Sequence, residues 1–411
     1  MKEPKIRIKG FSGEWKRPLL EECLEISNEV NNQNLYGKNE VLSVSDESGV
    51  VNQIKHLGRS YAGKSLSGYK ILRPDQIVYT KSPLRQKPFG IIKVNNGETG
   101  IVSVLYGIYD AKEGVYPKYI QRYFDPSNRI NNYLLPLVNK GAKNTMNISD
   151  ETALQGTISI PPTQDEQKAI CNVLDGIDAQ ILASTSRLAS LKQMKAASLQ
   201  AMFPQEGETV PKVRFKGFEG EWKKVKLNTF AKRIMRKNSN LESSLALTIA
   251  SAYGLVSQAE YFNNLVVGSN IQNYYLLKKG EFAYNKSYSN GYPFGSVKRL
   301  DRYEQGILST LYIVFSIDNS VSSDYITHFF DTTLWHKEIA ERAEEGARNH
   351  GLLNIATRDF FDIYIWMPDS VKEQQSIASF FTFLDRQIAL HTQRLEKLKQ
   401  IKAACLDKMF V

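Results

Sequence analysis

The sequence has few of the residues that metal and redox sites use. It contains three cysteines and five histidines in 411 residues. No two cysteines form a CxxC pair and the histidines show no ligand spacing, so we expect no bound metal. The scattered cysteines, Cys23, Cys171 and Cys405, are typical of reduced thiols in the cytoplasm and not of a disulfide framework.

Long apolar runs are also missing. No stretch of about 18 apolar residues could cross a membrane. The first residues, Met1–Arg7, lack the apolar segment of a signal peptide. We therefore expect a cytoplasmic protein without membrane contact. Its hydrophobic fraction of 42% is typical of a globular chain.

Recognisable catalytic motifs are absent, with one misleading exception. Gly58–Ser65 satisfies the phosphate-loop pattern GxxxxGK[ST]. That loop requires a helix whose first N–H groups surround the phosphate, whereas Gly68 and Pro74 follow here. The corresponding place in the second half of the chain, Gly268–Asn270, has no lysine. We interpret Lys64 as a loop cation and predict that the chain is not an enzyme.

What the chain does contain is a repeat. Pro4–Trp15 returns as Pro211–Trp222, at a shift of 207 residues. The pairs Glu166-Gln167 and Met202-Phe203 return at the same shift, as Glu373-Gln374 and Met409-Phe410. Two copies of one unit predict a pseudo-symmetric molecule, which suits a partner that also has two halves.

Each copy begins with a region of short β-type runs. In the first copy these runs include Val50-Val51, Ile77–Tyr79, Ile91–Val94 and Ile101–Tyr106, and a helical stretch broken at two prolines follows over Tyr119–Val138. The second copy keeps a skeleton of matching segments at shifts of 205 and 206, and most other positions differ. The matching segments are Tyr79–Ser82 with Tyr284–Ser287, Pro88–Gly90 with Pro293–Gly295, Gly100–Tyr106 with Gly306–Tyr312, and Phe124-Asp125 with Phe330-Asp331.

Each copy ends with a long amphipathic helix. Thr163-x-x-Glu166 and Ser370-x-x-Glu373 are predicted capping boxes, in which the hydroxyl and the glutamate each accept a free backbone N–H. Apolar residues then recur at spacings of four and three, which predicts a coiled-coil seam over about 40 residues, roughly 60 Å. The seam positions are Ile170, Leu174, Ile177, Ile181, Leu188 and Leu191, then Ile377, Phe381, Leu384, Ile388, Leu395 and Leu398. Two separate helices, each lying on its own domain, are the alternative.

The net charge of +10 favours a polyanionic partner, although a solubilising surface charge would also explain it. Basic, amide and tyrosine side chains in the loops are the candidate DNA-binding residues, because they contact phosphates and base edges. They are Arg59, Lys64, Lys81, Arg85, Lys87, Lys143 and Asn144 in the first copy, and Asn270, Lys286, Tyr288, Lys298, Arg348, Asn349 and His350 in the second. For each one a solvated loop residue is the alternative. Lys81 with Lys286, and Asn144 with Asn349, recur in both copies, which shared turns would also explain.

Together these features resemble the specificity subunit of type I restriction–modification systems. The two Pro-Lys-x-Arg-x-Lys-Gly-Phe-x-Gly-Glu-Trp segments resemble that family's domain starts. The two helices that begin after Pro161 and Pro368 resemble its central helical regions. The resemblance implies an α+β fold with two target recognition domains (residues 1–160 and 205–367) and two helical spacer regions (residues 161–204 and 368–411) that pack antiparallel as a coiled coil.

The resemblance also implies a function. Each recognition domain would bind one half of a bipartite, asymmetric site in double-stranded DNA. The helices, with Leu188, Leu191, Leu395 and Leu398, would bind two methyltransferase subunits and through them the restriction and translocase subunits. S-adenosylmethionine, ATP and Mg²⁺ would be bound by those partners and no cofactor by this chain. The alternatives are a coiled-coil scaffold that binds acidic proteins or RNA, and a nucleotide-hydrolysing enzyme that uses Gly58–Ser65.

Overall fold

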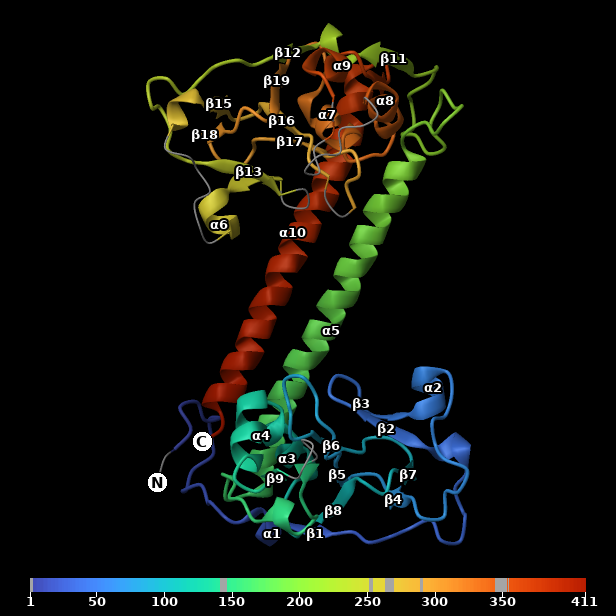
Figure 1. The fold of residues 1–411 in the computed structure, drawn as a ribbon, viewed down its shortest axis with the longest axis vertical. Coiled ribbons are helices and arrows are strands. Elements are labelled where there is room, and N and C mark those ends of the chain that lie inside the picture. Colours follow the sequence, from blue (N-terminus) through green and yellow to red (C-terminus); the bar gives the residue numbers. More distant parts are fainter. Residues whose placement is uncertain are drawn as a thin grey trace. The chain divides into compact units, whose positions relative to one another are not determined.

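The computed structural model describes residues 3–140, 146–250, 254–262, 270–288, 291–343, 353 and 355–411. The chain forms two compact units, shown in Figure 1. Unit 1 consists of Met1–Thr185 and Gln393–Val411, and unit 2 consists of Ser186–Thr392. The two long helices, α5 (Gln164–Ala201) and α10 (Val371–Lys408), each begin in one unit and end in the other.

Unit 1 combines short strands with short helices. Its strands are β1 (Leu24–Ile26), β2 (Leu42–Ser45), β3 (Gly49–Asn52), β4 (Lys70–Leu72), β5 (Ile77–Tyr79), β6 (Ile92–Val94), β7 (Gly100–Val102), β8 (Gly107–Ala111), β9 (Asn139–Lys140) and β10 (Met146–Asn147). Its short helices are α1 (Leu20–Cys23), α2 (Gln53–Leu57), α3 (Pro117–Phe124) and α4 (Ser127–Leu134), with 3₁₀ turns η1 (Lys38–Glu40) and η3 (Thr152–Leu154).

Unit 2 has a similar set. Its strands are β11 (Lys223–Lys226), β12 (Ala231–Arg233), β13 (Leu247–Ala250), β14 (Gly254–Ser257), β15 (Tyr275–Lys278), β16 (Phe282–Asn285), β17 (Ser296–Arg299), β18 (Gln305–Leu308), β19 (Ile313–Ile317) and β20 (Tyr364–Met367). Its short helices are α6 (Gln258–Phe262), α7 (Ser323–Phe329), α8 (His336–Arg342) and α9 (Thr357–Phe361), with 3₁₀ turns η4 (Leu227–Thr229) and η5 (Ile271–Asn273).

The two units share one sheet topology. The antiparallel four-stranded sheet has the order β1-β8-β5-β6 in unit 1 and β12-β19-β16-β17 in unit 2. Each unit adds a two-stranded sheet (β4-β7 and β15-β18) and a hairpin (β2-β3 and β13-β14). This repeated topology confirms the predicted α+β fold and explains why skeleton positions survive in both copies.

Strands β5 and β16 each contain three successive buried apolar residues, Ile77–Tyr79 and Phe282–Tyr284, because both faces of the sheet are covered. In β5, Ile77 and Tyr79 belong to the core that contacts α3 and α4, whereas Val78 belongs to a second cluster beneath the hairpin. In β16, Phe282 faces the first core of unit 2 and Ala283 faces the second. A strand buried on both faces loses the polar alternation of a surface strand, as expected.

One predicted strand is shorter than its sequence indicates. The apolar run Ile101–Tyr106 predicts a single strand, but β7 ends at Val102. The next four residues form a β-turn in which the N–H of Tyr106 donates to the carbonyl of Ser103 at 3.0 Å. Ser103 favours this turn because its hydroxyl also accepts the N–H of Leu105, at 3.3 Å.

The predicted capping boxes are half right. The hydroxyl of Thr163 accepts the N–H of Glu166 at 3.3 Å, and that of Ser370 accepts the N–H of Glu373 at 3.4 Å. The glutamates do not return to the helix start. Both oxygens of Glu166 accept N–H groups of Arg7, at 2.8 and 2.9 Å.

Unit 2 repeats this ion pair. Both oxygens of Glu373 accept N–H groups of Arg214, at 2.7 and 2.8 Å. A bidentate, charge-assisted pair is stronger than a hydrogen bond to a neutral backbone N–H, and both glutamates are buried. Each glutamate therefore binds the arginine and not the backbone N–H at the helix start. Through this ion pair, the Pro-Lys-x-Arg segment of each unit is bound to the start of its long helix.

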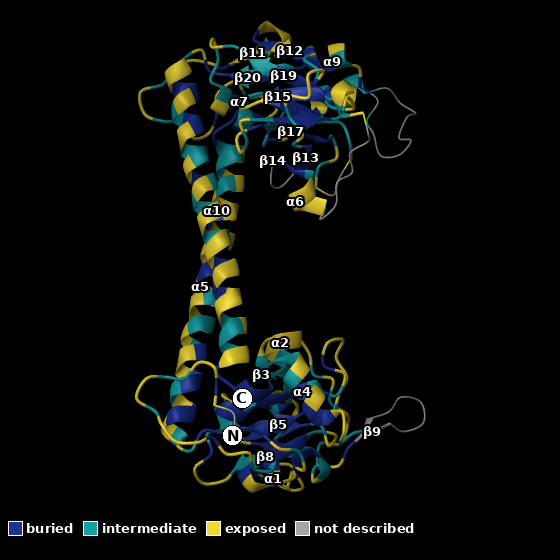
Figure 2. Ribbon diagram, turned by 90° about the vertical axis from the view of Figure 1, so that its left-hand side faces the viewer, coloured by how far each residue is buried: buried dark blue, intermediate teal, exposed yellow. Residues whose placement is uncertain are grey.

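The long helices pack antiparallel within each unit, which confirms the predicted coiled coil. In unit 1 the ammonium group of Lys402 in α10 lies 2.6 Å from Asp178 in α5. In unit 2 the ammonium group of Lys195 in α5 lies 2.8 Å from Asp385 in α10. These are the same two positions of the repeat, 207 residues apart. Most seam residues are buried in a stripe along helices that are otherwise exposed (Figure 2).

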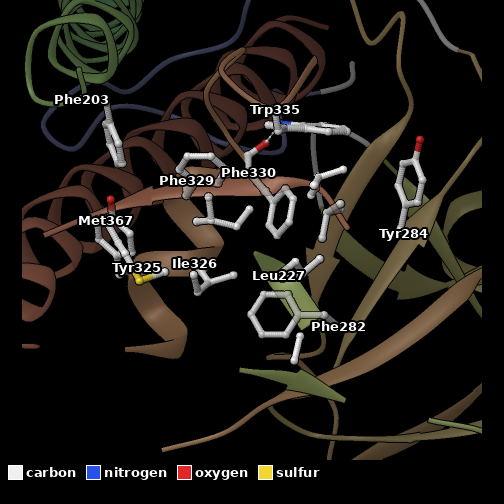
Figure 3. Close-up of a cluster of buried hydrophobic side chains, with 14 of the residues drawn as sticks. Phe203, Leu227, Phe282, Tyr284, Tyr325, Ile326, Phe329, Phe330, Trp335 and Met367 are labelled. Carbon is white, nitrogen blue, oxygen red and sulfur yellow. Dashed lines mark hydrogen bonds between the residues drawn. The ribbon is translucent and has the colours of Figure 1, made fainter. Parts of the chain in front are cut away.

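Each long helix ends inside a core. Phe203, just beyond α5, is fully buried in unit 2, where its ring lies 5.9 Å from Trp222 and 5.7 Å from Tyr325. Figure 3 shows Phe203 and Tyr325 in this cluster. In unit 1 the ring of Phe410 lies 5.4 Å from Tyr119. Each core is therefore completed by the helix that begins in the other unit.

This arrangement predicts a large effect for one side chain at a helix end. Phe203→Ala should lower the free energy of unfolding by about 3–5 kcal/mol, as for other buried phenylalanines. The matched control is Phe383→Ala, because Phe383 on α10 is exposed and its loss should change stability by less than about 0.5 kcal/mol. Denaturant unfolding measures both, and equal effects of the two substitutions would contradict this role for Phe203.

Candidate nucleic-acid interface

The best-matched loop of the two units follows the central strand. In unit 1 it joins β5 to β6, and its two ends are held together because the hydroxyl of Tyr79 donates to the carbonyl of Phe89 at 2.5 Å. In unit 2 it joins β16 to β17, and the hydroxyl of Tyr284 donates to the carbonyl of Phe294 at 2.9 Å. The repeated Tyr-x-Lys-Ser and Pro-Phe-Gly segments are thus the two ends of one loop.

A glycine allows the ends of each loop to approach. A Cβ atom on Gly90 would lie 2.9 Å from the Tyr79 ring, and one on Gly295 would lie 2.0 Å from the carbonyl oxygen of Asn285. Both glycines also have positive φ angles, +95° and +77°. The first and last residues of each loop are therefore held together in a closed neck, formed by Tyr79 with Phe89 and Gly90 in unit 1 and by Tyr284 with Phe294 and Gly295 in unit 2. Lys81 and Lys286 lie directly beyond this neck.

Three connections of unit 1 surround a polar hollow of about 370 Å³ beside Lys81. Lys81 and Ser82 come from the β5–β6 loop, and Leu105 comes from the turn between β7 and β8. Asp150 and Glu151 follow β10, the strand after the predicted Lys143 and Asn144. Of the predicted DNA-binding residues that the structure describes, Lys81 alone lines the hollow.

The floor of this hollow is an ion-paired carboxylate that the sequence analysis missed. Asp150 lies 2.6 Å from the ammonium group of Lys81 and 2.8 Å from that of Lys70. Burial alone would raise the pKa of Asp150, but the two lysines outweigh it and the net pKa lies below its ordinary value. Glu151 also lines the hollow, so the two lysines there are balanced by two carboxylates and the hollow has no net formal charge.

The equivalent place in unit 2 has different chemistry. Tyr275, which pairs with Leu308, occupies the position of Lys70, which pairs with Val102. The carbonyl of Lys286 accepts the N–H of Leu353 at 2.9 Å. Among the described residues no carboxylate pairs with the Lys286 ammonium group. The two units therefore present the same lysine in unlike surroundings.

The other predicted contact residues fall into three groups. Exposed side chains are Arg59, Lys64, Arg85, Asn270 and Tyr288. Ion-paired side chains are Lys87, whose ammonium group lies 2.6 Å from Asp46, and Lys298, which lies 2.8 Å from Asp331. Residues outside the described part of the chain are Lys143, Asn144, Arg348, Asn349 and His350. Lys87 is buried, so its charge holds the loop in place.

The phosphate-loop pattern does not form a phosphate loop. Gly58 ends the short helix α2 in a left-handed conformation, with φ +77°. No helix begins at Ser65, and the chain reaches β4 at Lys70 through a turn. Without a helix start there are no aligned N–H groups to bind phosphate.

Unit 2 also contains a histidine–carboxylate cluster near the helices. His328, Asp331 and Asp385 place their possible metal-ligating atoms within 4.8 Å of one another. The ammonium group of Lys195 lies 2.8 Å from Asp331 and from Asp385, in the place that a cation would take. Burial alone would raise the pKa of Asp331, but Lys298, His328 and Lys195 outweigh it and the net pKa lies well below its ordinary value. The cluster is therefore a structural ion pair.

The leucines predicted to bind partner subunits lie within the seam. Leu188, Leu191, Leu395 and Leu398 are all buried. A partner would instead contact exposed side chains of the same helices.

No helix within the described residues is long and apolar enough to span a membrane.

Comparisons with known proteins give a family model and several similar solved structures. The model of the type I restriction modification DNA specificity domain matches residues 219–400. The S subunit of a type I restriction-modification system from M. genitalium is 13% identical, and the match covers 100% of this chain and 99% of that one with a TM-score of 0.59. The HsdS subunit from Thermoanaerobacter tengcongensis is 14% identical over 96% of each chain, with a TM-score of 0.45. No curated protein matches the chain. The likeness to the M. genitalium protein shows a shared fold.

The closed neck of the loop in unit 2 can be tested by adding one methyl group. Gly295→Ala should destabilise unit 2 by about 2–4 kcal/mol, from the positive φ angle together with the collision at Asn285. Gly280→Ala is the matched control, because Gly280 has φ +88° but no atom within 4 Å of the added group, and should cost only about 1–2 kcal/mol. Thermal unfolding measures both, and equal losses would argue against a tight neck.

Proposed function

We propose that the chain is a specificity subunit of a type I restriction-modification system and that each unit recognises one half of a bipartite site in double-stranded DNA. The domain match over residues 219–400 supports DNA recognition by a component without catalytic activity. The proposal of a bipartite site rests on one observation: the two units share one sheet topology but have unlike loops. Two copies of one scaffold that differ around Lys81 and Lys286 suit two different half-sites.

The proposed division of labour follows the chain. Residues 1–160 and 205–367 are the target recognition domains, and residues 161–204 and 368–411 are the helical spacer regions. Arg59, Lys64, Lys81 and Arg85 contact the first half-site, and Asn270, Lys286 and Tyr288 contact the second. The exposed arginines and lysines neutralise phosphates, which gives affinity that falls with salt.

A repeated apolar surface supports the proposal that two identical subunits bind. In unit 2 a groove of about 340 Å³ runs between α5 and the segment around Arg214, with Met194, Val213 and Phe380 in its lining. In unit 1 the residues at the same positions of the repeat are Ile401, Ile6 and Val173, and all three are exposed. Exposed apolar side chains at matching places are typical of a binding surface used twice.

The occupants we propose for these two surfaces are two methyltransferase subunits, which in turn bind the restriction and translocase subunits. These partners supply S-adenosylmethionine, ATP and Mg²⁺, since adenine methylation and ATP-driven translocation require them. The DNA that they act on lies in the cytoplasm, which is where we place the complex.

The methylated adenines of the host DNA test the DNA site directly. Single-molecule sequencing should find adenines methylated in a split motif with a spacer of fixed length, and deletion of this chain should abolish that methylation. Replacing residues 222–366 should change one half of the motif and leave the other. A continuous motif, or a change in both halves, would contradict two independently recognising units.

The apolar surfaces can be tested by adding charge. Met194→Lys or Ile401→Lys should each reduce the number of methyltransferase subunits bound per chain from two to one, because an ammonium group opposes burial. Combining both substitutions should abolish binding. Met235→Lys is the matched control, since Met235 is exposed on unit 2 and lies outside the groove lining. Light scattering of the purified complexes gives the stoichiometry, and two subunits on the doubly substituted chain would exclude these surfaces.

A further inference from the structure

The turn that shortens β7 presents a bare apolar side chain, and unit 2 repeats it. Leu105 is 67% exposed at the turn between β7 and β8. Leu311 is 63% exposed at the turn between β18 and β19. The two leucines are at matching positions of Gly-Ile-x-Ser-x-Leu-Tyr, 206 residues apart.

Both turns are held by the same two hydrogen bonds. In unit 2 the N–H of Tyr312 donates to the carbonyl of Ser309 at 3.2 Å, and the N–H of Leu311 donates to the Ser309 hydroxyl at 3.4 Å. These bonds correspond to those of Ser103 in unit 1. Tyr106 and Tyr312 then pack against the apolar clusters beneath the sheets. Each leucine is therefore part of a turn whose backbone is held by hydrogen bonds and by the packing of the following tyrosine.

Packing within the protein does not account for these leucines. With about two thirds of each side chain exposed, burial contributes little stability. The third position of a β-turn ordinarily favours small or polar residues such as asparagine and glycine. A single exposed leucine needs no explanation, but an exposed leucine at the same turn position of both units does.

The surroundings in unit 1 point to nucleic acid. Leu105 lines the same hollow as Lys81 and Ser82, with the carboxylates of Asp150 and Glu151 beside them. An apolar tip beside an ammonium group suits DNA, because bases have apolar faces and phosphates lie next to them.

We propose that Leu105 and Leu311 each insert between adjacent base pairs of the DNA, one in each half-site. Contact with a base edge would depend on the sequence, so it would not favour one residue in two units that bind different half-sites. The apolar face of a base pair is present in every sequence, and apolar side chains at such places unstack and kink the duplex. The proposal rests on the proposed recognition of DNA and adds how each unit deforms its half-site.

The test uses the full complex of this chain with its methyltransferase subunits. The probe is a duplex that carries the site assigned from methylated adenines, with 2-aminopurine placed at successive positions other than the methylated ones. Unstacking raises 2-aminopurine fluorescence, so the unsubstituted complex should show a rise at one step in each half. Leu105→Ala should remove one rise and Leu311→Ala the other, each with about tenfold weaker binding.

Two further variants serve as controls. Leu105→Met should keep the rise, since a long apolar side chain remains. Leu35→Ala should leave both rises intact, because Leu35 is 69% exposed on unit 1 and does not line the hollow. If Leu105→Ala and Leu311→Ala both bind tightly with unchanged fluorescence, the leucines do not insert although DNA recognition stands. If the unsubstituted complex does not bind the duplex, the proposed function itself fails.

Discussion

Each unit depends on an apolar contact in which the Met-Phe pair that follows a long helix is buried in the core of the unit where that helix ends. Phe203 packs on Trp222 and Tyr325 in unit 2, and Phe410 packs on Tyr119 in unit 1. A buried aromatic side chain contributes a large share of the marginal stability of a domain. The bidentate pairs of Arg7 with Glu166 and of Arg214 with Glu373 fix the opposite end of each helix. Neither unit is therefore complete without both long helices.

This dependence explains which parts of the sequence remain alike. The helix starts, the helix ends and the arginine segments repeat at a shift of 207 residues, because each contributes to a contact that both units need. The loops above the sheet tolerate change, since they are supported from below by the Tyr79–Phe89 and Tyr284–Phe294 bonds. A constant scaffold with variable loops is what separate recognition of two half-sites requires. The leucines of the two turns belong to the constant part, which is consistent with a contact that does not depend on base identity.

The sequence predicted the features that depend on local pattern. The spacing of Leu174, Leu188 and Leu395 gave the helical seam, and the turn residues around Pro88 and Pro293 marked the loops. Features that depend on distant partners were missed. Arg7 and Glu166 are 159 residues apart, so the capping box could not be distinguished from an ion pair. The ion pairs of Lys87 and Asp150 were missed for the same reason. Only the fold brings Lys87 beside Asp46 and Asp150 beside Lys70.

Hydrogen exchange on a chain that lacks Met409–Val411 tests the central dependence most directly. The last residues lie far along the chain from β5 and β8, yet they share a core with them. Amide protection should fall in β5 and β8 of unit 1, while β16 and β19 of unit 2 keep theirs. Unchanged protection in unit 1, or an equal loss in both units, would contradict this dependence.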